Sequence, residues 1–159
     1  MEIKEATPAD LPVMVRAGRL LHEETDYGKF LLYDEILVQE NVLKIIQNEY
    51  GFCCLLWDGN ILSGLILGHL SPNFYDPRQL KGICDAIGIM PKYRKTHWAS
   101  KMLNMFEEWA TEKGASLFFC GGYSKQFDGM VKRRGYQKIE TSYVKKTERV
   151  SKDINTGGE

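Results

Sequence analysis

The segment from Ile87 to Leu103 constrains the fold of this chain more than any other. It begins with the apolar run 87–90, continues through a basic loop after Pro91, and ends in an amphipathic helical pattern. A strand that leads through a basic loop into a helix builds an anion site, because backbone N–H groups and the positive end of the helix dipole meet there. The segment therefore predicts an anion-binding loop between a strand and a helix.

The rest of the chain shows helical and strand-like patterns in a definite order. Helical spacing of apolar residues covers roughly 7–21, 34–49, 99–113 and 125–134, and strand-like runs cover 2–6, 52–57, 61–69, 83–90, 116–120 and 136–145. The inner face expected for the second helix is Ile36, Val42, Leu43 and Ile46. Asp58-Gly59 predicts a hairpin. Helices segregated around a mostly antiparallel sheet predict an α+β domain.

The composition is that of an ordinary globular domain. The chain has 159 residues, 43% of them hydrophobic and 26% charged, and a formal net charge of zero. This balance gives no sequence-wide attraction to nucleic acid or to anionic membranes. No apolar run has the length of a membrane span, and the start lacks the pattern of a secretory signal, so we expect a cytoplasmic protein. We also expect one domain over residues 1–149 and a disordered polar tail over 150–159.

The cysteines and histidines show no spacing typical of a metal site. The four cysteines lie in apolar, strand-like runs without C-x-x-C spacing: Cys53, Cys54, Cys84 and Cys120. We expect buried small hydrophobic residues here, with a catalytic thiol or a metal site as the alternative. His22, His69 and His97 lie far apart in the sequence. The sequence therefore predicts no metal.

The basic loop resembles the acetyl-CoA pyrophosphate loop of the GNAT N-acetyltransferase superfamily. The pattern of that family is Arg or Gln, two residues, Gly, one residue, then Gly or Ala. Arg94 and Ala99 match it, whereas His97 stands at the first glycine position. The order of elements from Met1 to about Arg149 is also that of the GNAT fold. The resemblance implies helices on both faces of the sheet, a fourth and fifth strand that splay apart, and acetyl-CoA as co-substrate.

The same resemblance implies which residues hold the co-substrate. Backbone amides from Lys95 to Ala99 would line the pyrophosphate, and the Arg94 and Lys95 side chains would add charge-assisted bonds to its oxygens. The fourth strand would hold the thioester carbonyl and the pantetheine arm, and Ser124 would bond that arm. The expected residues are Ile87, Gly88, Ile89, Arg94, Lys95, Thr96, His97, Trp98, Ala99, Ser100 and Ser124.

The histidine in the loop has two interpretations. The Cβ of His97 would crowd the phosphate or force a backbone conformation that is strained for a residue other than glycine. Alternatively, the imidazole would itself donate a hydrogen bond to a phosphate.

Two residues are candidates for proton transfer. Asp85 is the one carboxylate of the fourth strand, and strand alternation predicts that it shares a face with Ile87 and Ile89. We expect it to act as a general base, directly or through water; the alternative is a carboxylate in solvent or paired with a lysine. The resemblance implies a tyrosine in the last helix, but Val131 occupies that position. Tyr123 is the expected substitute, with packing as the alternative.

The amine acceptor would enter near three loop aromatics, Tyr27, Phe30 and Tyr75, which packing would explain equally well. The basic triplet 132–134 ends the last helix, where solvated cations suit the helix dipole. Contact with the adenosine phosphate or with an acidic partner is the alternative for this triplet.

The predicted function is an acetyl-CoA-dependent N-acetyltransferase that acts on a primary amine of a small molecule or protein, with a homodimer left open. The alternative is a GNAT-like module without catalysis that has a structural or protein-interaction role; His97 and Val131 favour it. Lost loop glycines are similar to those of phage-encoded GNAT-like proteins, for which the location would be the host cytoplasm. No nucleic-acid or membrane partner is expected.

Overall fold

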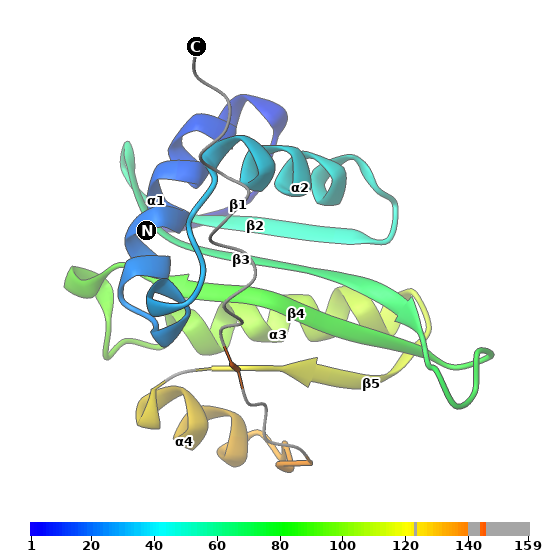
Figure 1. Cartoon of the computed structure of the whole chain (residues 1–159). Helices are drawn as coiled ribbons and strands as arrows, with labels where there is room; N and C mark the ends of the chain where they lie inside the picture. The colour runs from blue at the N-terminus through cyan, green and yellow to red at the C-terminus, as the bar shows by residue number, and fades with distance from the viewer. Residues whose placement is uncertain (123, 140–143, 146–159) are drawn as a thin grey trace.

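A five-stranded sheet with the order β1-β2-β3-β4-β5 forms the centre of the computed structural model, which describes residues 1–122, 124–139 and 144–145 (Figure 1). The strands are β1 (Glu2–Glu5), β2 (Gly51–Asp58), β3 (Ile61–Pro72), β4 (Leu80–Ile89) and β5 (Ala115–Cys120). Neighbouring strands run antiparallel except β4 and β5, which are parallel. The mostly antiparallel sheet expected from the sequence is confirmed.

Helices cover both faces of this sheet. The helices α1 (Leu11–Glu23) and α2 (Glu35–Gln47) pack on one face, and α3 (Trp98–Glu112) packs on the other. The helix α4 (Lys125–Arg133) lies at the β5 edge of the sheet (Figure 1). Short 3-10 turns precede or follow the helices: η1 (Pro8–Asp10), η2 (Asp26–Lys29) and η3 (Pro91–Tyr93). Within the described residues, no helix is long and apolar enough to cross a bilayer.

Local capping explains where the 3-10 turn η1, which leads into α1, and the helix α2 begin. The backbone N–H of Thr7, the N-cap of η1, donates to Asp10 Oδ2 at 2.8 Å. Before α2, Asp34 Oδ1 accepts from the N–H groups of Ile36 and Leu37 at 3.0 and 3.1 Å. Each bond satisfies a donor that the first turn of a helix would otherwise leave free.

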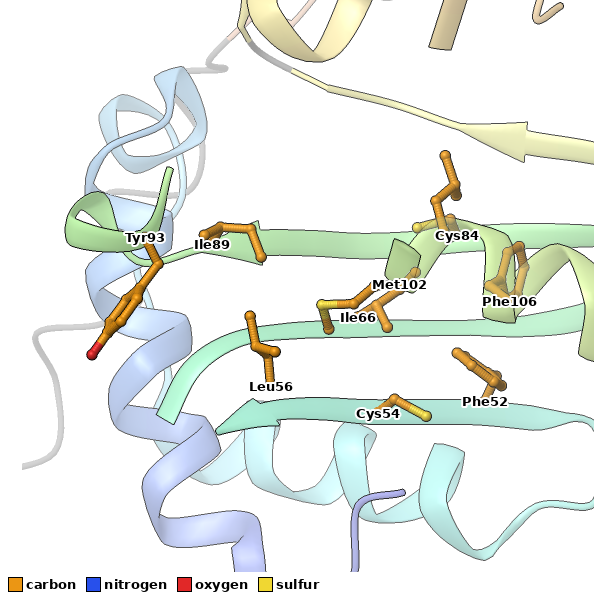
Figure 2. Packing of buried hydrophobic residues seen from close by; sticks show 10 residues of the cluster. Phe52, Cys54, Leu56, Ile66, Cys84, Ile89, Tyr93, Met102 and Phe106 are labelled. Carbon is orange, nitrogen blue, oxygen red and sulfur yellow. The ribbon is translucent and has the colours of Figure 1, made fainter. Parts of the chain in front are cut away.

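The core consists of two layers, one on each face of the sheet. The layer under α3 contains Phe52, Cys54, Leu56, Ile66, Met102, Leu103 and Phe106 (Figure 2). The layer under α1 and α2 contains Leu11, Met14, Ala17, Cys53, Leu55 and Leu65. Successive β2 side chains point to opposite faces, so both faces of that strand are buried. This explains why residues 52–57 read as an unbroken apolar run.

The strand β4 has two different halves. It pairs with β5 from Leu80 to Cys84, and the described part of the chain shows no β5 partner beyond that point. β3 continues to pair with β4 as far as Ile89. Leu67 of β3 opposes Ala86, whereas the next residue opposes Cys84, so Asp85 is an extra residue in a β-bulge. The splayed fourth and fifth strands are thereby confirmed.

Two expectations from the sequence, the inner face of α2 and the last strand, need correction. Ile36 was expected on the inner face of α2 but is 73% exposed. The inner stripe of α2 includes Val38, Val42 and Ile46, and Ile36 lies about 200° around the helix from Val38. Residues 136–139 and 144–145 form no strand, so the expected last strand 136–145 is wrong where it is described. Its residues 140–143 and the tail 150–159 lie outside the described residues.

Candidate active site

A cavity of about 920 Å³ opens where β4 and β5 separate. Its walls come from the second half of β4, the loop before α3, the α1 helix and the α4 helix. Gly121 and Gly122, which follow β5, also line it. The cavity therefore joins the basic loop to the end of β4 that lacks a β5 partner.

Several loop residues hold the loop in place. Thr96 Oγ1 donates to the Tyr93 carbonyl at 2.8 Å, and the Tyr93 hydroxyl donates to Asp58 Oδ2 at 2.9 Å. Tyr93 is itself buried in the core layer under α3 (Figure 2). The loop is thus fixed to the sheet rather than free in solvent.

The backbone strain considered as one interpretation of His97 is absent. His97 is the N-cap of α3 with φ −80° and ψ −3°, values that any residue adopts. Lys95 instead takes φ +64°, the left-handed region that favours glycine. The loop needs its unusual conformation two residues before the family's glycine position. The sequence pattern could not reveal this, because the match was anchored on Arg94 and Ala99.

Arg94 has two partners within the protein. Its Nε donates to the Ile89 carbonyl at 2.9 Å, and its Nη2 forms an ion pair with Glu24, which follows α1. Arg94 therefore ties the loop both to β4 and to the end of α1. Its bond to a phosphate oxygen stays a prediction.

The basic triplet divides into two kinds of residue. Arg133 and Arg134 line the cavity, whereas Lys132 forms a 2.7 Å ion pair with Asp128 on the exposed side of α4. The cavity thus has four Arg or Lys side chains in its lining, at positions 94, 95, 133 and 134. These cations and the first turn of α3 give this part of the cavity the character of an anion site.

Arg134 also connects the end of α4 to α3. It forms an ion pair with Glu107 and donates to Ser100 Oγ at 3.3 Å and to Asn104 Oδ1 at 3.1 Å. The Tyr136 hydroxyl donates to Glu107 Oε1 at 2.6 Å, and burial together with this carboxylate raises the pKa of Tyr136 well above its usual range. These bonds hold the C-terminal end of α4 against the start of α3, where Ser100 lies.

The α1 wall of the cavity is stiffened by two side chains. The Tyr33 hydroxyl donates to the Val15 carbonyl at 2.8 Å, and burial raises the pKa of Tyr33. His22 Nε2 lies 3.0 Å from the Leu31 carbonyl. Both contacts hold the segment between α1 and α2 against α1. Tyr27 of this segment lines the cavity, and its role on the acceptor side stays a prediction.

Asp85 lines the cavity, but not on the expected face. Ile87 and Ile89 pack toward α3, whereas Asp85 lies beside His69. The prediction of a shared face is wrong because the bulge at Asp85 interrupts the alternation of side chains. His69 Nδ1 and Asp85 Oδ2 are 2.7 Å apart, and the two side chains are 39% and 33% exposed. The lysine pairing considered for Asp85 is not found among the described residues.

His69 was missed by sequence reasoning. It lies 16 positions before Asp85, and β3 opposite β4 brings it close only because of the strand register. To predict that His69 and Asp85 lie together, one would have had to assume an antiparallel β3–β4 pairing with one extra residue in β4. The sequence contains no local signal for that extra residue.

Most other expected co-substrate residues do line the cavity: Ile87, Gly88, Ile89, Arg94, Lys95, Thr96, His97, Ala99, Ser100 and Ser124. A Cβ at Gly88 would meet Leu21 Cδ1 of α1, so a larger residue at this strand position would require the Leu21 side chain to shift. Ser124 Oγ also accepts from the Phe127 N–H at 3.1 Å and caps α4. Trp98 is not in the cavity lining; it packs on the α3 side, with its ring 4.6 Å from that of His97.

Three further expectations have mixed outcomes. Tyr123 lies outside the described residues. Phe30 does not line the cavity, and Tyr75 is 92% exposed in the β3–β4 turn, where its ring contacts Phe74. Val131 packs against the core layer under α3. Of the two predicted proton-transfer residues, Asp85 is therefore the one that lies in the described lining of the cavity.

The cysteines behave as buried apolar side chains. Burial raises the pKa of the Cys53 and Cys84 thiols to about 12 and that of Cys54 and Cys120 to about 11. A thiol with so high a pKa carries almost no thiolate at neutral pH, and the thiolate is the nucleophile. The prediction of buried hydrophobic cysteines is confirmed for Cys53, Cys54 and Cys84, whereas Cys120 is half-buried.

The sequence matches the acetyltransferase (GNAT) family over residues 17–127, which run from within α1 to the first turn of α4 and include the second half of β4 and the loop before α3. The chain belongs to this family. No curated protein gives a match.

Solved structures share the fold at low sequence identity. A predicted acetyltransferase from Clostridium acetobutylicum, solved with acetyl-CoA, is 14% identical with a TM-score of 0.74 and covers 91% of this chain and 95% of its own. An aminoglycoside antibiotic 6′-N-acetyltransferase from Acinetobacter haemolyticus is 16% identical with a TM-score of 0.69, covering 92% and 99%. A transcriptional regulator from Bacillus halodurans is 17% identical with a TM-score of 0.70, covering 92% and 99%. At these identities the likeness shows the fold.

Proposed function

We propose that this chain is an acetyl-CoA-dependent N-acetyltransferase that acts on a primary amine of a small molecule or protein. One observation carries the proposal. A single cavity joins a basic loop and helix N-terminus to a strand segment that has no β5 partner and to a carboxylate, Asp85. Family membership and the acetyl-CoA bound in the Clostridium acetobutylicum structure support the choice of co-substrate.

The residues present suit acetyl-CoA. Its pyrophosphate would bind the amides at the start of α3 and the cations Lys95 and Arg133, which have no ion-pair partner in the described part of the chain. Its pantetheine arm carries amide groups, and the edge of β4 from Asp85 to Ile89 offers backbone groups without a β5 partner. Acetyl-CoA supplies the acetyl group as an activated thioester.

The protein's part in the reaction is to position the amine and accept its proton. Overall, an ammonium R–NH₃⁺ and acetyl-CoA give R–NH–CO–CH₃, the free thiol of CoA and one proton; the N–C bond forms as the C–S bond breaks. Asp85 is the group that takes a proton from the amine. The amide of Ile89 is the donor for the thioester carbonyl, because the next amide, that of Met90, donates to Ser63 of β3 and strand alternation turns the Ile89 N–H to the other side.

The catalytically inactive module is the second candidate. Val131 supports it, because no tyrosine stands at that position to protonate a leaving thiolate. His97 no longer supports it, because its backbone conformation is ordinary and its N–H lies at the start of α3. Attack by the amine releases protons that a leaving thiolate can take up, so the missing tyrosine does not exclude turnover.

Calorimetry with acetyl-CoA and CoA, followed by thiol release with a panel of primary amines, tests the proposal. We expect saturable binding of both ligands and amine-dependent release of CoA. No binding at millimolar ligand would overturn the co-substrate assignment. Binding without turnover on any amine would favour the inactive module.

A further inference from the structure

His69 and Asp85 form a pair that the proposed reaction does not yet explain. His69 belongs to the paired region of β3, opposite Ile83 of β4. Asp85 is the bulge residue directly after Cys84, the last residue of β4 that pairs with β5. The bulge therefore places a carboxylate at the point where the sheet opens, with an imidazole beside it.

The carboxylates in the cavity lining differ in their partners. Two acidic residues line the described cavity, Glu24 and Asp85. Glu24 forms an ion pair with Arg94, so its carboxylate holds the loop against the end of α1. Asp85 is instead paired with an imidazole through one oxygen, Oδ2. Its other oxygen, Oδ1, has no hydrogen-bond partner among the described residues.

The polarity of this hydrogen bond follows from the chemistry of the two groups. A carboxylate accepts hydrogen bonds, so His69 donates its Nδ1–H to Asp85 Oδ2 at 2.7 Å. The bond fixes the rotamer of an aspartate that is one third exposed and would otherwise sample several. A positioned base must lie within hydrogen-bond reach of the proton it takes, and a fixed rotamer supplies that condition.

We propose that His69 is a positioning residue of the active site, whose Nδ1–H orients the carboxylate of Asp85 to take the proton of the acceptor amine. This inference rests on the proposed function. The proton passes from the amine nitrogen to Asp85 Oδ1, and His69 keeps its own Nδ1–H throughout.

Asparagine and glutamine at position 69 separate this role from that of a second base. The Nδ2 of asparagine is as many bonds from Cα as the imidazole Nδ1, so His69→Asn keeps a donor for Asp85. In His69→Gln the amide nitrogen lies one bond further out, and His69→Ala removes the donor. Asn and Gln side chains cannot act as bases, so only a positioning role predicts that asparagine rescues the rate.

Steady-state kinetics with the best amine of the panel tests the proposal. We expect His69→Ala and His69→Gln to lower kcat roughly tenfold or more while KM for acetyl-CoA is unchanged, since small misplacements of a reacting group can cost about 10²-fold. His69→Asn retains most of the wild-type kcat. Asp85→Asn loses about 10²–10⁴-fold, and adding His69→Ala to it changes nothing further. Ser71→Ala, two positions along the same face of β3, is the unaffected control.

A measurement on the ligand-free protein tests the pair itself. Nitrogen-15 NMR of the imidazoles should show His69 as the Nδ1–H tautomer, and Asp85→Ala should shift it toward the Nε2–H tautomer. The spectrum of His69→Asn assigns the signal among the three histidines.

The outcomes distinguish a failure of the role proposed for His69 from a failure of the proposed acetyltransferase function. A wild-type protein that acetylates no amine overturns the proposed function and this inference with it. A working enzyme in which His69→Ala has wild-type kcat overturns the inference alone. A working enzyme in which His69→Asn is as slow as His69→Ala also overturns it, because the imidazole itself would then be required. An Nε2–H tautomer in the wild type would contradict the donor assignment.

Discussion

The two halves of β4 are built from similar residues, but one half belongs to the packed sheet and the other forms a wall of the cavity. The half from Leu80 to Cys84 pairs with a strand on each side, and its side chains pack against α3 and β5. Among the described residues, the half from Asp85 to Ile89 pairs with β3 alone, and it lines the cavity on its other side. One extra residue, Asp85, marks the change. One strand thus forms part of the core where β5 pairs with it, and a binding edge where β5 diverges from it.

The largest effect should appear on the paired half. Phe106 of α3 is fully buried and packs against Phe52 and Trp109. We expect Phe106→Ala to lower the free energy of unfolding by about 3–5 kcal/mol, because it leaves a cavity in the core. Denaturant titration measures this change. Phe74→Ala, at a side chain that is 86% exposed, is the matched control and should change stability by less than about 0.5 kcal/mol. Equal losses would mean that the layer under α3 does not dominate stability.

An intermediate effect should appear on ligand binding at the open half. Arg94→Ala removes the bonds to Ile89 and Glu24 that hold the loop. We expect acetyl-CoA binding to weaken by about one to two orders of magnitude, since a hydrogen bond to a charged group contributes roughly 1.5–3 kcal/mol. Lys132→Ala should have little effect, because Lys132 pairs with Asp128 outside the cavity.

Glu24→Gln distinguishes two ways in which Arg94 could act in this experiment. If Arg94 works by holding the loop against α1, Glu24→Gln weakens binding in the same direction, though less. If Arg94 instead works by contact with phosphate, Glu24→Gln leaves binding unchanged or strengthens it. Calorimetry measures the affinity of both variants for acetyl-CoA. Equal losses for Arg94→Ala and Lys132→Ala would contradict the assignment of the anion site.

The smallest effect concerns two glycine substitutions that should have opposite signs. Lys95→Gly should raise the free energy of unfolding by up to about 1 kcal/mol, because Lys95 has φ +64° and a left-handed residue costs roughly that much. His97→Gly should lower it by up to about 1 kcal/mol, because φ −80° gives no strain to relieve and glycine adds freedom to the unfolded chain. Thermal unfolding compares the two. Stabilisation by His97→Gly would place the strain where the family pattern suggested.

Sequence patterns predicted the fold well because its elements are encoded locally. The unbroken apolar run at 52–57, the Asp58-Gly59 turn and the stripe through Met102 and Phe106 each follow from periodicity alone. The order of helices and strands along the chain then restricted the fold to a few possible topologies. The site was predicted less well, because its details depend on register. The bulge at Asp85, its contact with His69 and the bond between Glu24 and Arg94 join residues far apart in sequence.

The open edge of β4 has a further consequence for encounters between protein molecules. A strand edge with free N–H and C=O groups is a template on which other chains add strands, and exposed edges of this kind promote aggregation. Here the edge forms a wall of a cavity whose other walls are α1, α4 and the loop before α3. A single extended ligand fits beside such an edge, whereas a second sheet does not. We therefore expect the enclosure that shapes the site to oppose pairing of this edge with a second molecule.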